Sequence, residues 1–160
     1  MTEKEIQDIL QPIIGQIVWG VEQGYGSFLN LEFGNPRTKI SEVYKPNKKN
    51  KFPFNKFNSR DVTIEGDYSF FIYMSNWKLY AKEKELACDK SERDEIEFAL
   101  GFINGQKLLK VTINTKENIT KLEFDLGGII IITDEDYTDE INEMWIFYTK
   151  SEKIMAYQND

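Results

Sequence analysis

Two glutamates, Glu32 and Glu123, come closest to a catalytic pattern in this sequence. Each stands between a leucine and a phenylalanine, in Leu31-Glu32-Phe33 and Leu122-Glu123-Phe124. Two carboxylates held near each other can serve as general acid and general base, so a carboxylate-dependent enzyme is one hypothesis. The alternation of each glutamate with apolar neighbours predicts instead that both side chains point away from the core, which disfavours that chemistry.

Histidine is absent from the 160 residues, and Cys88 is the single cysteine. Nucleophilic systems of the Ser-His-Asp and Cys-His kinds need an imidazole to take up the proton, so both are excluded. The usual zinc sites draw on several cysteine or histidine ligands and are excluded as well. We therefore expect no catalytic residue, no metal and no cofactor, and a function without catalysis is favoured.

Two polar segments have residue types that can bind ions. Residues 134–140 carry five carboxylates, but their order lacks the central glycine and alternating oxygens of an EF-hand loop. Residues 24–27, Gly-Tyr-Gly-Ser, resemble a turn whose backbone amides cradle an anion, yet the lysine of a phosphate-binding loop is missing. A solvated loop and a tight turn with positive φ are the favoured interpretations.

Trp19, Trp77 and Trp145 are candidates for the wall of a ligand pocket. Such a pocket at the centre of the sheets would make the protein a small-ligand-binding half-barrel. Packing in the hydrophobic core explains these three side chains equally well and is favoured.

Residues 34–60 differ in composition from the rest of the chain. They hold eight lysines and arginines against Glu42 alone, a local charge of +7, so the remainder of the −7 chain carries −14. Three prolines and several asparagines predict an irregular basic loop inserted here. Phe52, Phe54 and Phe57 among the lysines are typical of anchors that become buried on a protein partner or a second subunit.

An ordinary solvated loop is the first interpretation of this basic segment, and a protein is favoured over nucleic acid as its partner. The sequence pI is about 4.8, so the acidic remainder would repel a phosphate backbone everywhere except at the loop. The acidic residues 134–140 and the basic loop have opposite charge, which makes pairing within a homodimer a further hypothesis.

Composition predicts one globular domain over residues 1–160, since 41% of the residues are hydrophobic and 29% charged. The longest apolar run, residues 129–132, is too short to span a membrane, and the first residues lack a signal-peptide pattern. Together with the lone cysteine, these features predict a cytoplasmic location and no membrane partner.

The order of apolar and polar residues predicts two helices. Thr2 and Glu5 form a capping box for a first helix that Pro12 ends, and Ser91 caps a second helix that closes at Gly105. Alternating or β-branched stretches predict antiparallel strands. These strands lie at residues 17–21, 27–33, 62–65, 68–73, 77–81, 86–88, 108–114, 119–125, 128–133, 143–150 and 154–157.

Parts of the first half return in the second half. A Gly-Gln pair precedes a Leu-Glu-Phe in both, and the six residues from Trp77 align with the six from Trp145. We therefore predict two internal units, about 2–88 and 91–160. The predicted fold class is α+β, with two pseudo-repeated helix-plus-antiparallel-sheet units forming a sandwich or partly closed barrel. Shared packing needs of strands are the alternative explanation of the similarity.

A resemblance to a family of small bacterial proteins without an assigned activity covers most of the chain outside residues 34–60. It rests on six segments of the sequence. They are Val18-Trp19-Gly20-Val21, the run from Gly24 to Leu29, Leu31-Glu32-Phe33-Gly34, the strand that begins at Trp77, Gly105-Gln106-Lys107-Leu108 and Phe124-Asp125-Leu126-Gly127-Gly128. The resemblance implies no activity, cofactor or catalytic residue. Small acidic bacterial proteins poor in histidine also resemble immunity proteins, which neutralise toxins.

The sequence therefore predicts a non-catalytic cytoplasmic binding protein, a toxin-neutralising or similar protein-interaction module whose acidic surface meets a basic partner. The alternatives are the small-ligand-binding half-barrel and the carboxylate-dependent enzyme. The predicted ligand or partner contacts are Trp19, Trp77, Trp145, Phe52, Phe54, Phe57, Glu32 and Glu123.

Overall fold

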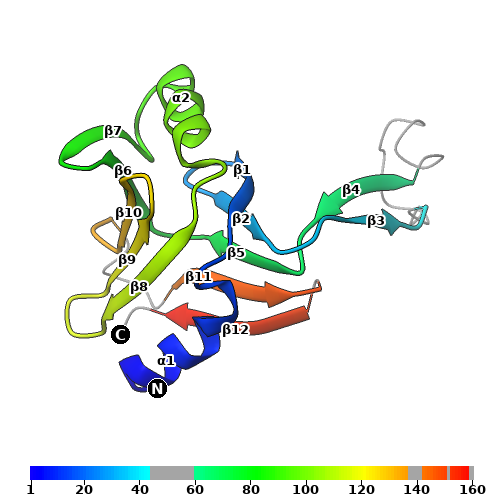
Figure 1. The fold of residues 1–160 in the computed structure, drawn as a ribbon, viewed down its shortest axis with the longest axis horizontal. Helices are drawn as coiled ribbons and strands as arrows, with labels where there is room; N and C mark the ends of the chain where they lie inside the picture. Colours follow the sequence, from blue (N-terminus) through cyan, green and yellow to red (C-terminus); the bar gives the residue numbers. More distant parts are fainter. Residues whose placement is uncertain (44–59, 137–141, 151, 159–160) are drawn as a thin grey trace, which may run out of the picture.

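The computed structural model describes residues 1–43, 60–136, 142–150 and 152–158. Of these residues, 53% lie in strands and 16% in helices, so the fold is mostly β. The described strands form two five-stranded antiparallel sheets and a separate two-stranded ribbon (Figure 1). None of the helices in the described part of the chain has the length and apolarity needed to cross a bilayer.

The first sheet has the strand order β1-β2-β5-β11-β12. Its strands are β1 (Val18–Gln23), β2 (Leu29–Phe33), β5 (Tyr68–Ile72), β11 (Glu143–Thr149) and β12 (Glu152–Gln158). All neighbours are antiparallel. Strands that are far apart in the sequence, β5 and β11, therefore lie side by side at the centre of this sheet.

The second sheet has the strand order β7-β6-β10-β9-β8. Its strands are β6 (Asn76–Ala81), β7 (Lys84–Cys88), β8 (Leu108–Asn114), β9 (Ile119–Phe124) and β10 (Gly128–Thr133). Here β6 comes from the first half of the chain and pairs with β10 from the second half. Each five-stranded sheet thus combines three strands from one half of the chain with two from the other.

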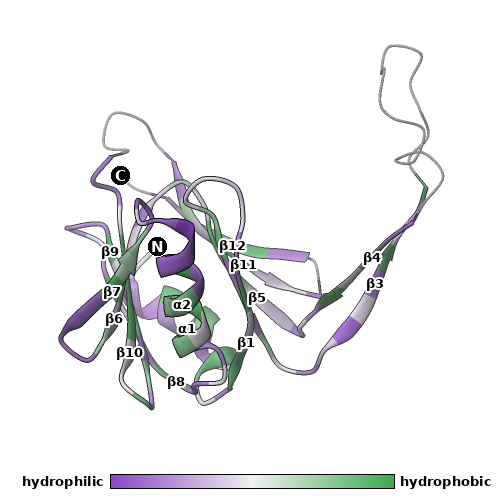
Figure 2. Ribbon diagram, turned by 90° about the horizontal axis from the view of Figure 1, so that it is seen from above, coloured by the Kyte–Doolittle hydropathy of each residue, from purple (hydrophilic) through white to green (hydrophobic). Residues whose placement is uncertain are grey.

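The hydrophobic core lies between the two sheets, which face each other in Figure 2. Alternate residues of each strand point inward because successive side chains of a strand lie on opposite faces. Trp77 and Trp145 are fully buried, and the ring of Trp145 stacks on that of Phe70 with centroids 4.7 Å apart. Burial of each such large side chain contributes about 1.5–3 kcal/mol.

A short exchange of backbone hydrogen bonds joins the two sheets where β1 and β8 begin. Ile17 and Lys107 form an isolated antiparallel bridge. Around it, the amide of Val18 donates to the carbonyl of Gln106 at 2.9 Å, and the amide of Leu108 donates to the carbonyl of Gln16 at 2.9 Å. The sandwich is therefore closed at this corner.

Two helices cover the openings of the sandwich, α1 (Glu3–Leu10) and α2 (Arg93–Ile103), at opposite ends of the view in Figure 1. The predicted capping box of α1 is confirmed, because Thr2 Oγ1 accepts from the Glu5 amide while Glu5 Oε2 accepts from the Thr2 amide. Pro12 lies in the 3-10 turn η1 (Gln11–Ile13) that follows α1, as expected for a residue that ends a helix.

The predicted cap of α2 is wrong by one residue. The N-cap is Glu92, which makes no side-chain capping bond. The Ser91 hydroxyl instead accepts a hydrogen bond from the amide of Cys88 at 3.0 Å, closing the turn that leaves β7. Ser91 therefore lies in the turn before α2, as predicted, but its hydroxyl accepts from the amide of Cys88 and not from an amide of the helix.

The predicted α+β class with two helix-plus-sheet units is also wrong. The fold is mostly β, with two short helices and three sheets in the described residues, and only the sandwich-like facing of the sheets fits the prediction. Neither half builds a five-stranded sheet of its own, since β11 and β12 complete the first sheet and β6 and β7 complete the second. Strand pairing over long sequence distances was not visible in the local pattern of apolar residues.

The two-stranded ribbon corrects the prediction of an irregular loop over residues 34–60. Strand β3 (Arg37–Ser41) pairs with β4 (Asp61–Glu65) in regular antiparallel register. Strand β4 was predicted and β3 was not. The ribbon extends away from the sandwich in both ribbon views (Figures 1 and 2). Residues 44–59, which connect its strands in the sequence, lie outside the described residues.

Candidate functional site

A buried carboxylate, that of Glu32, holds the base of the ribbon. Glu32 lies on the outer face of the first sheet, opposite its core-facing neighbours, and is only 6% exposed. Its Oε1 accepts from Asn30 Nδ2 at 2.7 Å, and its Oε2 accepts from the Ser69 hydroxyl at 2.6 Å and the Gly66 amide at 2.8 Å. Since Gly66 links β4 to β5, Glu32 fixes the point where the ribbon leaves the sheet.

A second carboxylate holds the other strand of the ribbon. Asp67 Oδ2 accepts from both the backbone amide and the side-chain amide of Asn35, at 2.9 and 3.1 Å. At Gly66 the two connections approach so closely that a Cβ atom would overlap the carbonyl oxygen of Phe33. The ribbon is therefore anchored through both of its connections to the sheet.

One face of the ribbon is apolar and exposed. The register pairs Ile40 with Val62 and Thr38 with Ile64, so these four side chains share a face. Ile40, Val62 and Ile64 are 59%, 63% and 65% exposed. A contiguous exposed apolar surface of this kind is typical of an interaction site.

The opposite face of the ribbon is charged and meets the first sheet in a shallow corner. Arg37 Nη2 lies 2.6 Å from Glu65 Oε1, and Lys39 Nζ lies 3.7 Å from Glu65 Oε2. The corner has a volume of about 280 Å³, lined by Lys39 and Glu65 from the ribbon and by Asn30, Ser69, Phe71 and Tyr148 from the sheet. The apolar face of the ribbon therefore points away from the body of the molecule.

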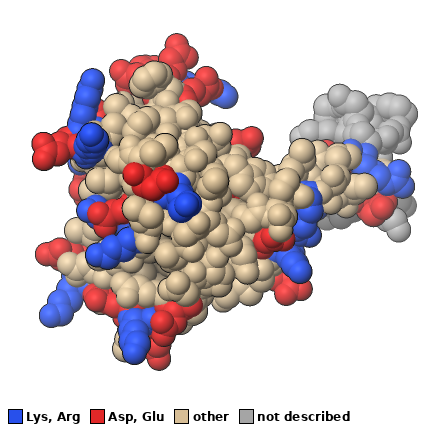
Figure 3. Space-filling model, in the orientation of Figure 1, with Lys and Arg blue, Asp and Glu red and all other residues tan. Residues whose placement is uncertain are grey.

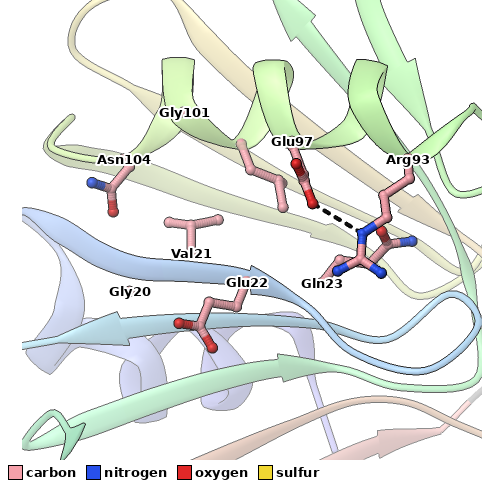
Figure 4. A pocket seen from close by; sticks show the side chains of 9 residues that line it. Gly20, Val21, Glu22, Gln23, Arg93, Glu97, Gly101 and Asn104 are labelled. Atoms are coloured by element: carbon pink, nitrogen blue, oxygen red, sulfur yellow. Dashed lines mark hydrogen bonds and ion pairs between the residues drawn. The ribbon is translucent and has the colours of Figure 1, made fainter.

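A larger groove of about 560 Å³ runs between α2 and the edge strand β1. Figure 4 shows Val21 pointing from β1 toward the helix, while Arg93, Glu97 and Asn104 point from α2 toward the strand. The groove is lined by Gly20, Val21, Glu22, Gln23, Arg93, Glu97, Leu100, Gly101 and Asn104. Its floor is therefore apolar at Val21 and Leu100, and its rim is polar.

The backbone of β1 bends where it forms this groove. The register with β2 shifts between Trp19 and Glu22, and Gly20 has a φ of +55°. A bulge of this kind disturbs the regular hydrogen-bonding edge that an added strand would need. We therefore expect the groove to recognise a partner through side chains and not by extension of the first sheet.

The groove has more acidic than basic side chains. Three carboxylates, those of Glu92, Asp94 and Glu95, lie at the start of α2 outside the lining, and the lining itself holds Glu22, Glu97 and one guanidinium. That guanidinium, Arg93, has its Nε 2.9 Å from Glu97 Oε1, with side chains 82% and 60% exposed. Exposed pairs of this kind contribute less than about 1 kcal/mol, so a cation from a partner can replace Arg93 at little cost.

The three tryptophans that the sequence singled out do not line any of the described pockets. The indole nitrogen of Trp77 donates to the carbonyl of Ser27 at 2.8 Å, and that of Trp145 donates to the Thr120 hydroxyl at 3.0 Å. Both rings are fully buried in the core. Trp19 is part-buried on the outer face of the first sheet, where it donates to the carbonyl of Gly34 at 2.9 Å.

Glu32 and Glu123 lie in different sheets, on β2 and β9, and the structure does not bring them together. Both side chains alternate with buried neighbours, so they are on outer faces that point away from each other. Glu123 pairs with Lys121 at 2.9 Å. The carboxylate of Glu32 instead accepts three hydrogen bonds at the base of the ribbon.

The remaining predicted positions fall in turns or outside the described residues. Phe52, Phe54 and Phe57 lie outside them, as does the part of the acidic loop from 137 to 141. Within the described chain, no cluster of acidic, cysteine or histidine side chains fits a metal ion. The 24–27 segment is a tight turn in which Gly26 has a φ of +60°.

Sequence reasoning missed the apolar face of the ribbon and the groove. The alternation of Thr38 and Ile40 with charged residues was a readable strand signal, but the surrounding prolines and lysines outweighed it. The groove combines β1 with α2, which begins 70 residues later at Arg93, so no local pattern could have indicated it.

Comparison with protein-family models, with curated proteins and with solved structures gives no match to this chain.

Proposed function

We propose that this protein is a non-catalytic binding module whose groove between α2 and β1 receives a basic segment of another protein. The observation that carries the proposal is the combination of an apolar floor at Val21 and Leu100 with the two carboxylates of Glu22 and Glu97 in the same lining. Three further carboxylates stand nearby at the start of α2, within residues 92–95. A segment with basic and apolar side chains would satisfy both parts of the groove. The toxin-neutralising role predicted from composition is one form of this function and stays a prediction.

The charge distribution supports binding by electrostatic attraction. Acidic side chains gather at the α2 end of the molecule, at the top of Figure 3. An acidic rim raises the rate at which a basic partner arrives, and the effect weakens as salt screens the charges. Contacts on the apolar floor are less sensitive to salt and would mainly slow dissociation.

The test is the binding of a labelled peptide in which lysines alternate with valines, followed by fluorescence anisotropy. We expect binding that weakens with salt, and an acidic peptide of the same length should not bind. The variant carrying Glu22→Lys and Glu97→Lys should lose at least about tenfold in affinity, since both positions line the groove.

The matched control for each single substitution, Glu22→Lys or Glu97→Lys, is Glu83→Lys, which makes the same charge change in the turn between β6 and β7. It should retain the wild-type affinity apart from a small general effect of net charge. Equal losses of affinity in the single variants Glu83→Lys, Glu22→Lys and Glu97→Lys would contradict a groove site, because attraction would then depend on total charge alone.

A further inference from the structure

We infer that the groove selects an arginine of its partner, and that this arginine takes the place of Arg93 on the carboxylate of Glu97. The inference rests on the proposed function of the groove and adds the side chain that the groove recognises. Arg93 is then an internal competitor, which occupies Glu97 in the free protein and leaves it when the partner binds.

The free protein already holds a guanidinium in the groove. Arg93 and Glu97 both belong to the lining, and Nε of Arg93 lies 2.9 Å from Oε1 of Glu97. Figure 4 shows both side chains on the side of α2 that faces β1. Among the lining residues that the structure describes, Arg93 carries the only positive charge. The internal pair therefore occupies the place where a cation of the partner would bind.

The pair uses only half of the carboxylate. It joins Nε of Arg93 to Oε1 of Glu97, and no donor from the described residues reaches Oε2. Once Arg93 has left, a guanidinium that approaches from solvent can donate two parallel hydrogen bonds to the two oxygens, which is stronger than a single bond. A lysine ammonium is a point charge without this fork, so the groove should prefer arginine to lysine.

Arg93 is weakly held at its position. It is the first residue of α2, where the positive end of the helix dipole disfavours a cation. In the pair the arginine precedes the glutamate by four residues, which is the less favourable order on a helix. The side chains of Arg93 and Glu97 are 82% and 60% exposed, so water and salt screen their attraction. Arg93 therefore contributes little to the stability of α2 and can be displaced at low cost.

The groove has room for the residues that flank the partner's arginine. Gly101 lies one helical turn beyond Glu97, and a Cβ atom built on it meets nothing within 4 Å. The floor at Val21 and Leu100 is apolar and lines the same groove. An apolar side chain beside the arginine would be buried on this floor, so an arginine with apolar neighbours is the feature that the groove recognises.

The test compares two labelled peptides of equal length in fluorescence anisotropy. Arginines alternate with valines in one peptide and lysines alternate with valines in the other. The wild type should bind the arginine peptide at least about threefold more tightly, because only a guanidinium can engage both oxygens of Glu97.

Removal of the competitor should strengthen binding. Arg93→Gln should raise the affinity for the arginine peptide by about two- to fivefold, which is the range expected from an exposed ion pair. Lys116→Gln is the matched control, since it removes the same charge in the turn between β8 and β9. It should change the affinity by much less. Urea unfolding of Arg93→Gln should match the wild type, which separates competition from a structural role.

A double-mutant cycle separates competition from net charge. Glu97→Gln keeps the size of the side chain and removes the charge for which the two guanidinium groups compete. In this background Arg93→Gln should no longer raise the affinity, and the preference for arginine should disappear. An effect of net charge alone would be the same in both backgrounds.

Nuclear magnetic resonance follows the displacement itself. The chain has three arginines, at positions 37, 60 and 93, so their Nε–H signals can be assigned in nitrogen-15-labelled protein. Addition of the arginine peptide should move the signal of Arg93 toward its position in Glu97→Gln, where the pair is broken. A signal that keeps its position while the peptide binds would contradict displacement.

The outcomes distinguish the inference from the proposed function. Arg93→Gln that binds no more tightly than Lys116→Gln, or equal affinities of the wild type for the two peptides, would overturn the inference and leave a groove for basic segments. No binding of either peptide by the wild type and by Arg93→Gln would remove both. Binding by Arg93→Gln alone would support both, since Arg93 would then block the groove of the wild type.

Discussion

The Ser69 hydroxyl donates a 2.6 Å hydrogen bond to Oε2 of Glu32, and this contact ties β5 to β2 on the outer face of the first sheet. The same oxygen accepts from the amide of Gly66, so one buried carboxylate satisfies both a side chain of the sheet and the backbone of the ribbon connection. The position of the ribbon therefore depends on a residue that the sequence had suggested for catalysis.

Replacement of Glu32 by alanine should destabilise the protein by about 3 kcal/mol, because three donors would lose a charged acceptor in a buried place. Glu32→Gln should cost less, since its amide oxygen can still accept from some of them. The measurement is urea unfolding. The control is Glu123→Ala, whose half-exposed pair with Lys121 is worth less than about 1 kcal/mol. Equal effects at the two glutamates would contradict the anchoring role of Glu32.

Gly66 and Gly101 should respond in opposite directions to alanine. A Cβ at Gly66 would overlap the carbonyl oxygen of Phe33, so Gly66→Ala should cost about 2 kcal/mol or more. A Cβ at Gly101 meets nothing within 4 Å, and alanine in a helix is favoured over glycine by about 0.5–1 kcal/mol. Thermal unfolding of both variants checks this, and a stabilising Gly66→Ala would mean that the ribbon connection is not so tight.

The hydroxyl group of Thr120 should contribute to the stability of the core. It is fully buried and accepts the hydrogen bond of the Trp145 indole at 3.0 Å. Thr120→Val keeps the shape but leaves a buried N–H without this acceptor, at a cost of about 1–3 kcal/mol. Thr120→Ser keeps the hydroxyl and loses only a methyl group, so its loss should be smaller. Urea unfolding followed by tryptophan fluorescence compares the two, and a neutral Thr120→Val would contradict the prediction.

Asp136 should contribute to stability only above the acid range. The hydrogen bond from Lys90, followed by that from Asn76, lowers the pKa of its carboxyl below the ordinary value. Because the folded-state pKa is the lower one, the contribution is complete above the unfolded pKa of about 4 and disappears as the pH falls through the folded pKa. The unfolding temperature of Asp136→Asn should therefore decrease less steeply in acid than that of the wild type. Equal slopes for the two proteins would contradict the prediction.

Local patterns were sufficient for many of the elements. The predicted strands at residues 108–114 and 128–133 agree with β8 and β10, because alternating apolar residues there face the core. The capping box of Thr2 and Glu5 was also readable, since its partners are three residues apart. In each case the atoms that decide the structure are close together in the sequence.

The arrangement of these elements could not be predicted in the same way. Strand β3 was missed because the prolines and lysines around Thr38 and Ile40 are typical of a loop, whereas its partner β4 begins 20 residues further on, at Asp61. Pairing of β5 with β11 depends on complementary surfaces across the whole chain. The groove and the apolar ribbon face arise from such pairings, so neither surface could be predicted from the sequence, and the binding function stays a prediction.

Each five-stranded sheet contains strands from both halves of the chain, and this constrains folding during synthesis. The first sheet stays incomplete until β11 and β12 have been synthesised, and β6 has no partner on one edge until β10 has been synthesised. The nascent first half therefore exposes unpaired strand edges. Such long-range pairing slows folding, because distant parts of the chain must meet before their contacts stabilise anything. Neither five-stranded sheet can be complete before strands of the second half have been synthesised, so protease-resistant fragments of the first half should not accumulate on stalled ribosomes.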